Sequence, residues 1–418
     1  MTPARRNRLI AAGTIGNVLE WYDFAIYGYL AFAIGHNFFP QIDATARVLA
    51  AFGVFAIGYF MRPIGGVVIG HIGDRYGRRA ALTWSVVLMA VPTFLIGLMP
   101  TYAAIGLAAP LLLTLLRMLQ GLSVGGEYTS SMVFLVEQAR TDRRAFYGAF
   151  SVLGAVGGIL LGSAVAAALT AALSPDQVEA WGWRIPFLFG PLIGVAGYLL
   201  RRQMAHSMPE AHRFVHPPVV EAFRDHWRLI LRIAGMSMIN AVGFYVMFVY
   251  VADWMQSADG IAPARALEIN TINMVLLLPV ILGGALLSDR IGRKPVMMTS
   301  VALVAVAAWP LFWLMHHPNG WLAFLGQFGF VLALGGFFAC NAAVLIEAVP
   351  RAIRCTTVSL GYNICLGLAG GTAPLVAAWL VARTDYQPAP AFYVIAAAVV
   401  SLVSLTSFRE TYRSPLPA

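Results

Sequence analysis

Four polar side chains recur at helical spacing in the first long apolar segment of the chain. They are Asn17, Glu20, Asp23 and Tyr27, and spacings of three, three and four residues place them along one stripe of a helix. Charged side chains inside an apolar helix are costly and usually mark function. Because a carboxylate shielded from water can bind and release a proton, we predict that Asp23, and in second place Glu20, couples proton movement to solute movement.

Arg117, Gln120 and Glu127 lie in the fourth apolar segment and share one helix face at about 100° per residue. The planar fork of Arg117 suits a carboxylate, so we predict that it binds a substrate carboxylate. The alternative is that Arg117 is the internal ion-pair partner of Asp23 or Glu127. Protonation of a carboxylate would free the arginine for substrate, and this exchange is a coupling mechanism, with Glu127 as a third proton-coupling candidate.

Arg62 is the other arginine within an apolar segment. It precedes Pro63 and comes shortly before a charged turn. This position fits an arginine that snorkels toward the membrane interface or bonds to freed backbone carbonyls as well as it fits one that contacts a ligand. We leave it out of the predicted substrate site. Like Arg117, it remains an alternative structural ion-pair partner for the carboxylates of the first segment.

With Arg117, the side chains of Gln120, Asn17 and Tyr27 are predicted to bind the solute. Polar side chains in the second half of the chain are predicted to complete this solute site. The candidates are Asn240, Tyr245, Asn341, Tyr362 and Asn363. Four nearby rings, Phe244, Phe248, Phe337 and Phe338, are candidates to line the site, although phenylalanine in a membrane helix more often packs or faces lipid.

The elements that must position these residues are membrane-spanning helices. Hydrophobic residues make up 59% of the 418 residues and charged residues 11%, against about 25% charged in a soluble domain. Several windows exceed the ~18 apolar residues that cross a bilayer. We predict an all-α membrane protein with twelve transmembrane helices, near 9–35, 48–70, 80–99, 107–137, 145–173, 184–202, 228–255, 268–289, 294–315, 321–347, 355–383 and 390–408. We expect the first helix to be retained, without a removable signal segment.

The longest non-apolar stretch divides the chain into two. We predict an N-terminal six-helix bundle at 1–202, a cytoplasmic linker at 203–227 and a C-terminal six-helix bundle at 228–418. Most of the 28 Lys and Arg residues fall on the side of the predicted turn around Asp74. The positive-inside rule therefore places both termini in the cytoplasm and the protein in the cytoplasmic (inner) membrane.

The two halves also share a charged turn. Asp74 and Asp289 each precede an Arg and are followed by Gly and basic residues, and Glu137 and Glu347 end helices that match at an offset of 210 residues. Two similar halves in one orientation are typical of a secondary transporter. We predict a cytoplasmic gate in which each glutamate accepts a bond from an arginine, formed by Asp74, Arg75, Arg78, Arg79, Glu137, Asp289, Arg290, Arg293 and Glu347.

Other chemistries lack their residues. Cys340, Cys355 and Cys365 form no CxxC pattern, and no histidine pair has metal-ligand spacing, so we predict no metal site and no cofactor. No Gly-rich phosphate loop occurs, and no assembled nucleophile indicates an enzyme. The net charge of +9 is explained by anionic inner-leaflet lipids and requires no nucleic acid. We expect a monomer whose partners are a small solute, protons and lipid.

Six stretches together resemble a known family. They read GNVLEWYDFAIYGYLA (16–31), FMRPIGGVVIGHIGDRYGRR (60–79), RMLQGLSVGGEYTSSMVFLVE (117–137), WGWRIPFLFG (181–190), LSDRIGRKPV (287–296) and SLGYNICLGLAGGTAP (359–374). They span nearly the whole chain and resemble the major facilitator superfamily, within it the metabolite:proton symporters that include proline/betaine, α-ketoglutarate, citrate and shikimate carriers. The resemblance implies two pseudo-symmetric six-helix bundles, a central cavity and proton chemistry mostly in the first half.

The function that we predict from these features is proton-coupled import of a small carboxylate-bearing metabolite by alternating access. An arginine at position 117 is a feature in which the chain resembles the organic-acid carriers. It therefore favours a di- or tricarboxylate or an α-keto acid as the substrate. The segment GGEYTSSMVFLVE resembles the proline/betaine members, so uptake of zwitterionic osmolytes is the alternative. A receptor that keeps the fold without transporting anything is a more distant alternative.

Overall fold

The computed structural model describes residues 3–40, 44–202 and 218–417. Its chain divides into two compact units: unit 1 comprises residues 1–134 and 153–219, and unit 2 comprises residues 135–152 and 220–418. The regular elements of the first half of the sequence are α1 (Pro3–Tyr29), α2 (Ala31–Phe38), α3 (Ala44–Phe60), α4 (Arg62–Arg75), α5 (Arg78–Leu98), α6 (Tyr102–Ile105), α7 (Ala108–Glu137), η1 (Thr141–Arg143), α8 (Arg144–Ala172), α9 (Pro175–Gln177), η2 (Val178–Gly182) and α10 (Arg184–Arg202).

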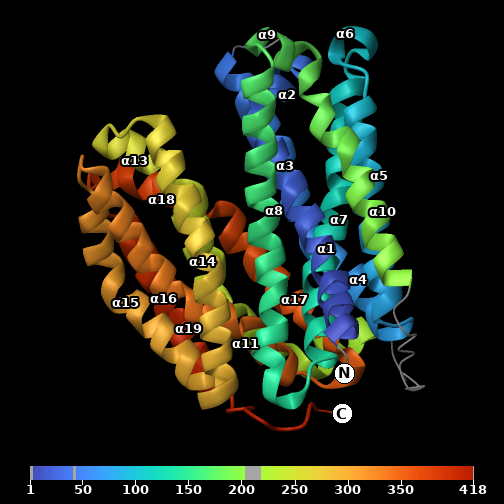
Figure 1. The fold of residues 1–418 in the computed structure, drawn as a ribbon, viewed down its shortest axis with the longest axis vertical. Coiled ribbons are helices and arrows are strands. Elements are labelled where there is room, and N and C mark those ends of the chain that lie inside the picture. The colour runs from blue at the N-terminus through green and yellow to red at the C-terminus, as the bar shows by residue number, and fades with distance from the viewer. Residues whose placement is uncertain (1–2, 41–43, 203–217, 418) are drawn as a thin grey trace. The chain divides into compact units, whose positions relative to one another are not determined.

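The second half of the sequence is also helical in its described residues. Its elements are α11 (Pro218–Met236), α12 (Met238–Tyr245), η3 (Val246–Tyr250), α13 (Val251–Asp259), α14 (Pro263–Ile291), α15 (Arg293–Met315), α16 (Gly320–Glu347), η4 (Arg351–Ile353), α17 (Arg354–Cys365), η5 (Leu366–Gly370), α18 (Gly371–Thr384) and α19 (Pro390–Thr406). Figure 1 shows α14, α15 and α16 side by side in unit 2, and α5 beside α10 in unit 1.

Each of the twelve predicted spans coincides with one helix or with consecutive helices, which confirms the all-α membrane fold. Eight helical stretches in the described part of the chain are long and apolar enough to cross a membrane. The predicted span 48–70 is divided at Met61 into α3 and α4, where Pro63 stands in the first turn of α4. A proline there has no backbone N–H to bond to the preceding turn, so one helix ends and another begins.

Two predicted spans contain π-helical turns, which sequence periodicity did not indicate. In η3 the wider turn leaves backbone carbonyls for side chains to satisfy. Gln327 Nε2 donates to Met247 O at 2.8 Å, and Asn270 Nδ2 donates to Phe248 O at 3.1 Å. The second π-turn, η5, separates α17 from α18 in the same way. Both turns lie in helices that carry predicted solute-site residues.

The boundaries of the bundles differ from the prediction at two places. Helix α11 begins at Pro218, ten residues before the predicted start, and is kinked at His226, whose φ and ψ are −124° and 16°. A proline suits the first helical position because its missing N–H has no partner there in any case. Residues 203–217 of the predicted linker lie outside the described residues.

In addition, residues 135–152, predicted within the N-terminal bundle, pack with unit 2.

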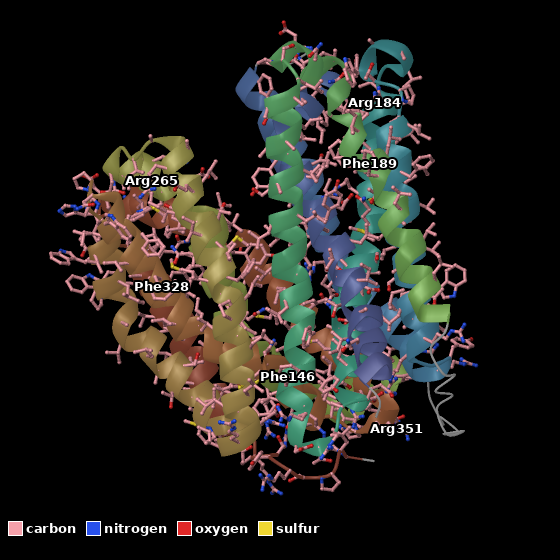
Figure 2. The ribbon with its side chains drawn as sticks, viewed as in Figure 1. Phe146, Arg184, Phe189, Arg265, Phe328 and Arg351 are labelled. Atoms are coloured by element: carbon pink, nitrogen blue, oxygen red, sulfur yellow. The ribbon has the colours of Figure 1, made fainter. Side chains whose placement is uncertain are left out.

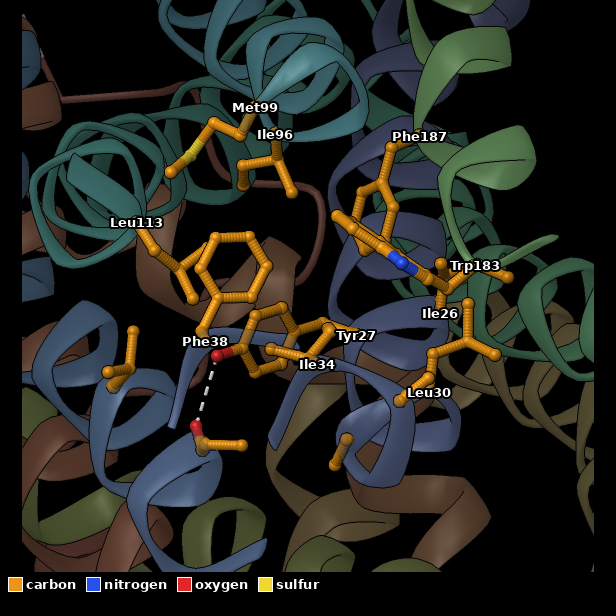
Figure 3. Close-up of a cluster of buried hydrophobic side chains, with 14 of the residues drawn as sticks. Ile26, Tyr27, Leu30, Ile34, Phe38, Ile96, Met99, Leu113, Trp183 and Phe187 are labelled. Carbon is orange, nitrogen blue, oxygen red and sulfur yellow. Dashed lines mark hydrogen bonds between the residues drawn. The ribbon is translucent and has the colours of Figure 1, made fainter. Parts of the chain in front are cut away.

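A large aromatic and aliphatic cluster fills one end of unit 1 (Figure 3). Trp183 lies edge-on to Phe38 and Phe187, with centroid distances of 5.6 and 6.2 Å. In the same cluster the Tyr27 hydroxyl donates to Ala51 O at 3.1 Å, which joins α1 to α3. This packing fixes the end of α1 and thereby the helix that carries the polar stripe.

Close helix contact brings α4 against α7. A methyl group added to Gly125 would overlap the backbone of Arg62 and Gly66, so only glycine permits the observed approach. The outer surface, by contrast, is apolar. Phe189, labelled on α10 in Figure 2, points away from the neighbouring helices and is 55% exposed. A lipid-facing surface explains this exposure, since it places apolar side chains in hydrocarbon.

Candidate functional site

The four polar residues of the α1 stripe are all buried within unit 1. Asn17 Nδ2 donates to Ser131 Oγ at 2.8 Å, which joins α1 to α7. Tyr27 bonds to the backbone of α3, as described above, so its hydroxyl serves packing between helices in this structure. Between these two residues lie the carboxyl groups of Glu20 and Asp23, which have different surroundings.

Asp23 belongs to a closed ring of four hydrogen-bonded side chains from α1, α5 and α7. Arg117 Nη1 donates to Asp23 Oδ2 and to Gln120 Oε1, both at 2.8 Å. Gln120 Nε2 donates to Thr93 Oγ1, and Thr93 Oγ1 donates to Asp23 Oδ1, again at 2.8 Å in each case. All four side chains are fully buried. The Asp23 carboxylate is thus neutralised by one cation and bonded through both oxygens.

Arg117 is also enclosed by aromatic rings of α1. Its guanidinium carbon lies 4.1 Å from the centroid of Tyr27 and 4.8 Å from that of Phe24. Such cation–π contacts are strongest where water is excluded. Of the two sequence interpretations of Arg117, this geometry favours the internal counter-ion of Asp23 over a direct ligand of the substrate.

Glu20 lies one turn away on α1 and forms a second charged group. It interacts electrostatically with Arg62 and Glu127, and neither of its carboxyl oxygens has a hydrogen-bond partner among the described residues. The guanidinium carbon of Arg62 lies 5.9 Å from the centroid of Trp21 and 5.4 Å from that of Tyr59. Arg62 is therefore buried among aromatic rings and does not snorkel to an interface.

Glu127 accepts a hydrogen bond from Ser85 Oγ, which joins α7 to α5. Ser123 Oγ in turn donates to Ser85 O at 2.6 Å. The predicted common face of Arg117, Gln120 and Glu127 is therefore divided between two sets of partners. Arg117 and Gln120 contact Asp23, whereas Glu127 contacts Ser85 two helical turns further along α7.

In unit 2 the predicted solute-site residues come from α12, α16 and α17. Asn240 Nδ2 donates to the Tyr362 hydroxyl at 2.9 Å. Asn363 is turned back onto its own helix and donates to Ser359 O at 2.9 Å. Tyr245 packs against Phe244, with ring centroids 5.6 Å apart. Asn341 is fully buried, and within the described residues no atom of its amide has a hydrogen-bond partner.

The charged turns of the two halves have the same local structure. Arg78 Nη1 donates to Asp74 Oδ1 at 2.6 Å and to Gly73 O at 2.8 Å. Arg293 Nη1 donates to Asp289 Oδ1 at 2.7 Å and to Ser288 O at 3.0 Å. The three residues of one turn keep a constant offset along the chain from the three residues of the other.

A glycine stands at the bend of each turn. Gly77 has φ of 95° and Gly292 has φ of 115°, a region that side chains with a Cβ rarely adopt. The neighbouring predicted gate residues differ: Arg75 and Arg290 are exposed, and Arg79 is half-buried. The buried part of each turn is thus the aspartate, the arginine four residues later and the carbonyl before the aspartate.

The turn of unit 2 is connected to residues 135–152, which belong to the same unit. Asp289 accepts bonds from the backbone N–H groups of Ala145 and Phe146, at 3.0 and 2.9 Å, and so caps the first turn of α8. A carboxylate is favoured there by the unpaired N–H groups and by the helix dipole. Phe146 is labelled near this turn in Figure 2.

Glu137 and Glu347, which match between the two halves of the chain, both accept bonds from arginines, as the sequence analysis expected. Glu347 Oε1 accepts bonds from Arg293 Nη2 at 3.3 Å and from Arg144 Nη1 at 3.4 Å. Glu137 receives Arg354 Nη1 at 2.7 Å. Arg144 and Arg354 were not among the predicted gate residues, although each is an arginine at the start of a helix that follows one of the two glutamates.

The sequence reasoning missed several partners in unit 1. Thr93 and Ser85, which complete the bonding of Asp23 and Glu127, were not among the candidates. The interaction of Arg62 with Glu20, by contrast, is the alternative that the sequence analysis left open for Arg62. The signal was present in part, because Ser85 and Thr93 are polar residues eight apart, on one face of the mostly apolar α5. In the described ranges no three His, Cys, Asp or Glu side chains are grouped as a metal site would need.

Comparison with known proteins identifies relatives over nearly the whole chain. Residues 9–216 match the family described as "Sugar (and other) transporter", and residues 233–417 match the "Major Facilitator Superfamily". The proline/betaine transporter of Salmonella typhimurium is 35% identical over 98% of this chain and 84% of its own length. A glycine betaine/proline/ectoine/pipecolic acid transporter of Dickeya dadantii, OusA, is 34% identical over 99% of this chain and 85% of its own length.

Solved structures show the same fold. The proton:xylose symporter XylE bound to 6-bromo-6-deoxy-D-glucose superimposes with a TM-score of 0.82, covering 100% of this chain and 98% of XylE at 17% identity. At that level of identity the likeness concerns the fold and not the substrate.

The substrate prediction requires a correction. We predicted a di- or tricarboxylate or an α-keto acid, and this is wrong, because the near full-length relatives are named for proline, betaines and related zwitterions. The prediction gave weight to Arg117 as an available cation, whereas its Nη1 is bonded to Asp23 and Gln120. By its family matches and its relatives, the chain belongs to the major facilitator superfamily.

Proposed function

We propose that this protein is a proton-coupled symporter that imports zwitterionic osmolytes such as proline and glycine betaine. The observation that carries the proposal is the 33–35% identity, over 96% or more of the chain, to transporters named for proline and betaine. A zwitterion carries no net charge across the membrane. The charge that couples its accumulation to the membrane potential is therefore that of the transported proton. The buried groups of unit 1 supply a place for that proton.

The charge balance of the buried groups supports a single transported proton. Apart from the Asp74–Arg78 pair of the charged turn, the described residues of unit 1 bury three carboxyl groups, Glu20, Asp23 and Glu127, and two guanidinium groups, Arg62 and Arg117. With all five ionised the set carries one excess negative charge, and one bound proton makes it neutral. Because an uncompensated buried charge is costly, the neutral set is favoured when the helices are closed around it. A zwitterion leaves this balance unchanged, whereas a dicarboxylate does not.

Asp23 is the carboxyl group whose protonation would have the largest mechanical effect. Its two oxygens bond to Arg117 and Thr93, and through them to Gln120, so it joins α1, α5 and α7. Protonation removes the charge that attracts Arg117 and converts one acceptor oxygen into a donor. The ring must then rearrange, and α1 is released from α7. We infer that this release accompanies reorientation of the loaded carrier.

We also propose that the two charged turns form the cytoplasmic gate. Closing it would place Asp289 on the first turn of α8 and Glu347 on Arg144 and Arg293. Opening would require these bonds to break, because the segment 135–152 must leave α14 and α16. The concentration of Lys and Arg on the side of these turns supports a cytoplasmic location for them and for both termini, in the inner membrane.

Uptake into proteoliposomes tests the proposal directly. Purified protein is reconstituted, and labelled glycine betaine, proline, citrate and α-ketoglutarate are offered with and without an inward proton gradient. We expect accumulation of glycine betaine or proline above the external concentration, and its loss when a protonophore collapses the gradient. Equal uptake of glycine betaine and proline with and without the gradient would overturn proton coupling. If neither glycine betaine nor proline is accumulated, the proposed substrate class is overturned.

A further inference from the structure

Three phenylalanine rings of unit 2 form a layer between α12 and α16. Phe244 lies 5.4 Å from Phe248, the residue one helical turn later, and 6.2 Å from Phe338 of α16. The Phe244 and Phe338 rings meet at 81°, edge to face. All three side chains are buried. Here we call this set the ring layer.

Polar side chains lie one turn away from the ring layer on both helices. Asn240 precedes Phe244 by four residues, and Asn341 follows Phe338 by three. Helices α14, α15 and α16 each reverse the direction of the element before it, through the turns at Gly260, Gly292 and Asn319, so α16 runs opposite to α12 (Figure 1). The two asparagines are therefore on the same side of the Phe244–Phe338 contact, about 5 Å from it along the helices.

The polar residues supply hydrogen-bond groups without a formal charge. Asn240 is bonded to the hydroxyl of Tyr362, which adds a third polar group from α17. Asn341 is fully buried, and its amide N–H₂ and oxygen are without a partner in the described part of the chain. A buried amide normally has partners, because leaving it unsatisfied costs about 1–3 kcal/mol. Its unsatisfied state indicates that a polar ligand completes this set, which we call the amide layer.

We propose that the ring layer binds the methylated ammonium of a betaine and that the amide layer binds its carboxylate. The inference rests on the proposed zwitterion transport and assigns the two ends of the solute to named side chains. Aromatic faces attract a quaternary ammonium within about 6 Å of the ring centroid, and amide N–H groups donate to carboxylate oxygens. A separation of about one helical turn matches a solute with a single carbon between its two charged ends.

The proposed site of rings and amides binds the betaine without a cationic side chain. Arg117 Nη1 is already bonded to Asp23 and Gln120. Charged side chains would bind a net-charged solute most strongly, whereas neutral rings and amides recognise a zwitterion without requiring a counter-ion. In this structure the rings contact one another, so the solute must separate Phe244 from Phe338 as it binds.

Fluorination of the rings tests the ring layer. Replacing Phe338 or Phe244 in turn by mono-, di- and trifluorophenylalanine removes electron density from the ring face with little change of shape. We expect the Kd of labelled glycine betaine for the purified protein to rise with each fluorine, by about tenfold or more across the series. The same series at Phe328, on α16 but stacked against Phe324 with ring planes 3° apart, is the matched control and should leave the Kd unchanged.

A second test compares solutes that share one end. Asn341→Ala should raise the Kd of glycine betaine about tenfold while leaving that of choline, which has the same ammonium but no carboxylate, within twofold. Conversely, trifluorination at Phe338 should weaken both. The carbon isostere of glycine betaine, with a tert-butyl group in place of the ammonium, should be insensitive to ring fluorination.

The outcomes separate this inference from the proposed function. If native protein accumulates glycine betaine and neither fluorination nor Asn341→Ala changes its binding, the two-layer assignment is overturned and the transport function stands. If the native protein neither binds nor accumulates glycine betaine or proline, the proposed function itself fails. The thermal midpoint of each variant is measured alongside, and an altered Kd supports the assignment only where that midpoint equals that of the native protein.

Discussion

Arg117 Nη1 lies 2.8 Å from Asp23 Oδ2, and neither side chain is exposed to solvent. The two residues are 94 positions apart in the sequence and come from α7 and α1. Both are held by further contacts, since Thr93 bonds to the second oxygen of Asp23 and Tyr27 stacks on the guanidinium. The pair is therefore a preformed junction between helices, and altering its charge alters the junction.

Asp23→Asn should abolish concentrative uptake while preserving exchange. The amide cannot carry a proton through the transport cycle, but it retains the size of the carboxyl group and can still bond to Thr93. Accumulation driven by an inward proton gradient is measured against exchange of labelled internal betaine for unlabelled external betaine. Asp142→Asn, whose side chain is exposed, is the control and should behave like the native protein. Gradient-driven accumulation by Asp23→Asn would assign the proton to another group.

Arg117→Gln should destabilise the protein strongly, because it leaves the buried Asp23 carboxylate without a cation. Breaking a buried pair from one side costs about 3–5 kcal/mol, whereas exposed pairs contribute about 0–1 kcal/mol. Arg265→Gln is a matched control, since Arg265 lies 2.7 Å from Glu268 but both side chains are about half exposed. Thermal unfolding of the purified variants measures the difference. The double substitution Asp23→Asn with Arg117→Gln should recover much of the loss, and an additive loss would exclude direct coupling of the pair.

Glu20→Gln should leave thermal stability unchanged or raise it, unlike Arg117→Gln. The Glu20 oxygens have no hydrogen-bond partner among the described residues, so the substitution breaks no bond and removes one buried charge. It also removes the excess negative charge of the five-residue set. We therefore expect uptake of betaine to continue down its concentration gradient while its dependence on the proton gradient weakens. A lower unfolding temperature together with intact proton coupling would refute the charge-balance argument.

Asp289→Asn should loosen the turn of unit 2. The substitution weakens the cap on Ala145 and Phe146, at a cost of about 1–3 kcal/mol. In the described part of the chain it leaves Glu347 as the carboxylate paired with the Arg293 guanidinium. Native cysteines report the change, because Cys340 and Cys355 are buried beside this turn and beside Arg354. Their reaction with a maleimide applied from the cytoplasmic side should become faster.

Two further variants sharpen the gate experiment. Arg290→Gln changes the neighbouring but exposed arginine and should leave cysteine reactivity at the native rate. Asp74→Asn changes the equivalent aspartate of unit 1 and should make the maleimide reaction faster, as Asp289→Asn does. Unchanged maleimide rates in both aspartate variants would argue against the turns as a gate.

Local spacing explains what could be predicted at the ends of the helices. Asp74 with Arg78, and Asp289 with Arg293, are four residues apart within one turn of sequence, so their pairing needs no tertiary information. The helices themselves were also predictable, because long apolar runs in a membrane protein can satisfy their backbone groups only as helices. The breaks at Pro63 and Pro218 follow from the missing N–H of proline, although the prediction misjudged both boundaries.

The sequence by itself determined that the buried charges of α1 lie on one stripe and that Arg117, Gln120 and Glu127 lie on one face of α7. Which carboxylate each cation meets was decided only by the tertiary structure. Helical periodicity fixes the direction of a side chain around its own axis but not the rotation and height of the neighbouring helix. Glycine contacts such as that of Gly125 with the backbone of α4 set those quantities in unit 1, and so Asp23 meets Arg117 and Thr93 while Glu20 is left beside Arg62.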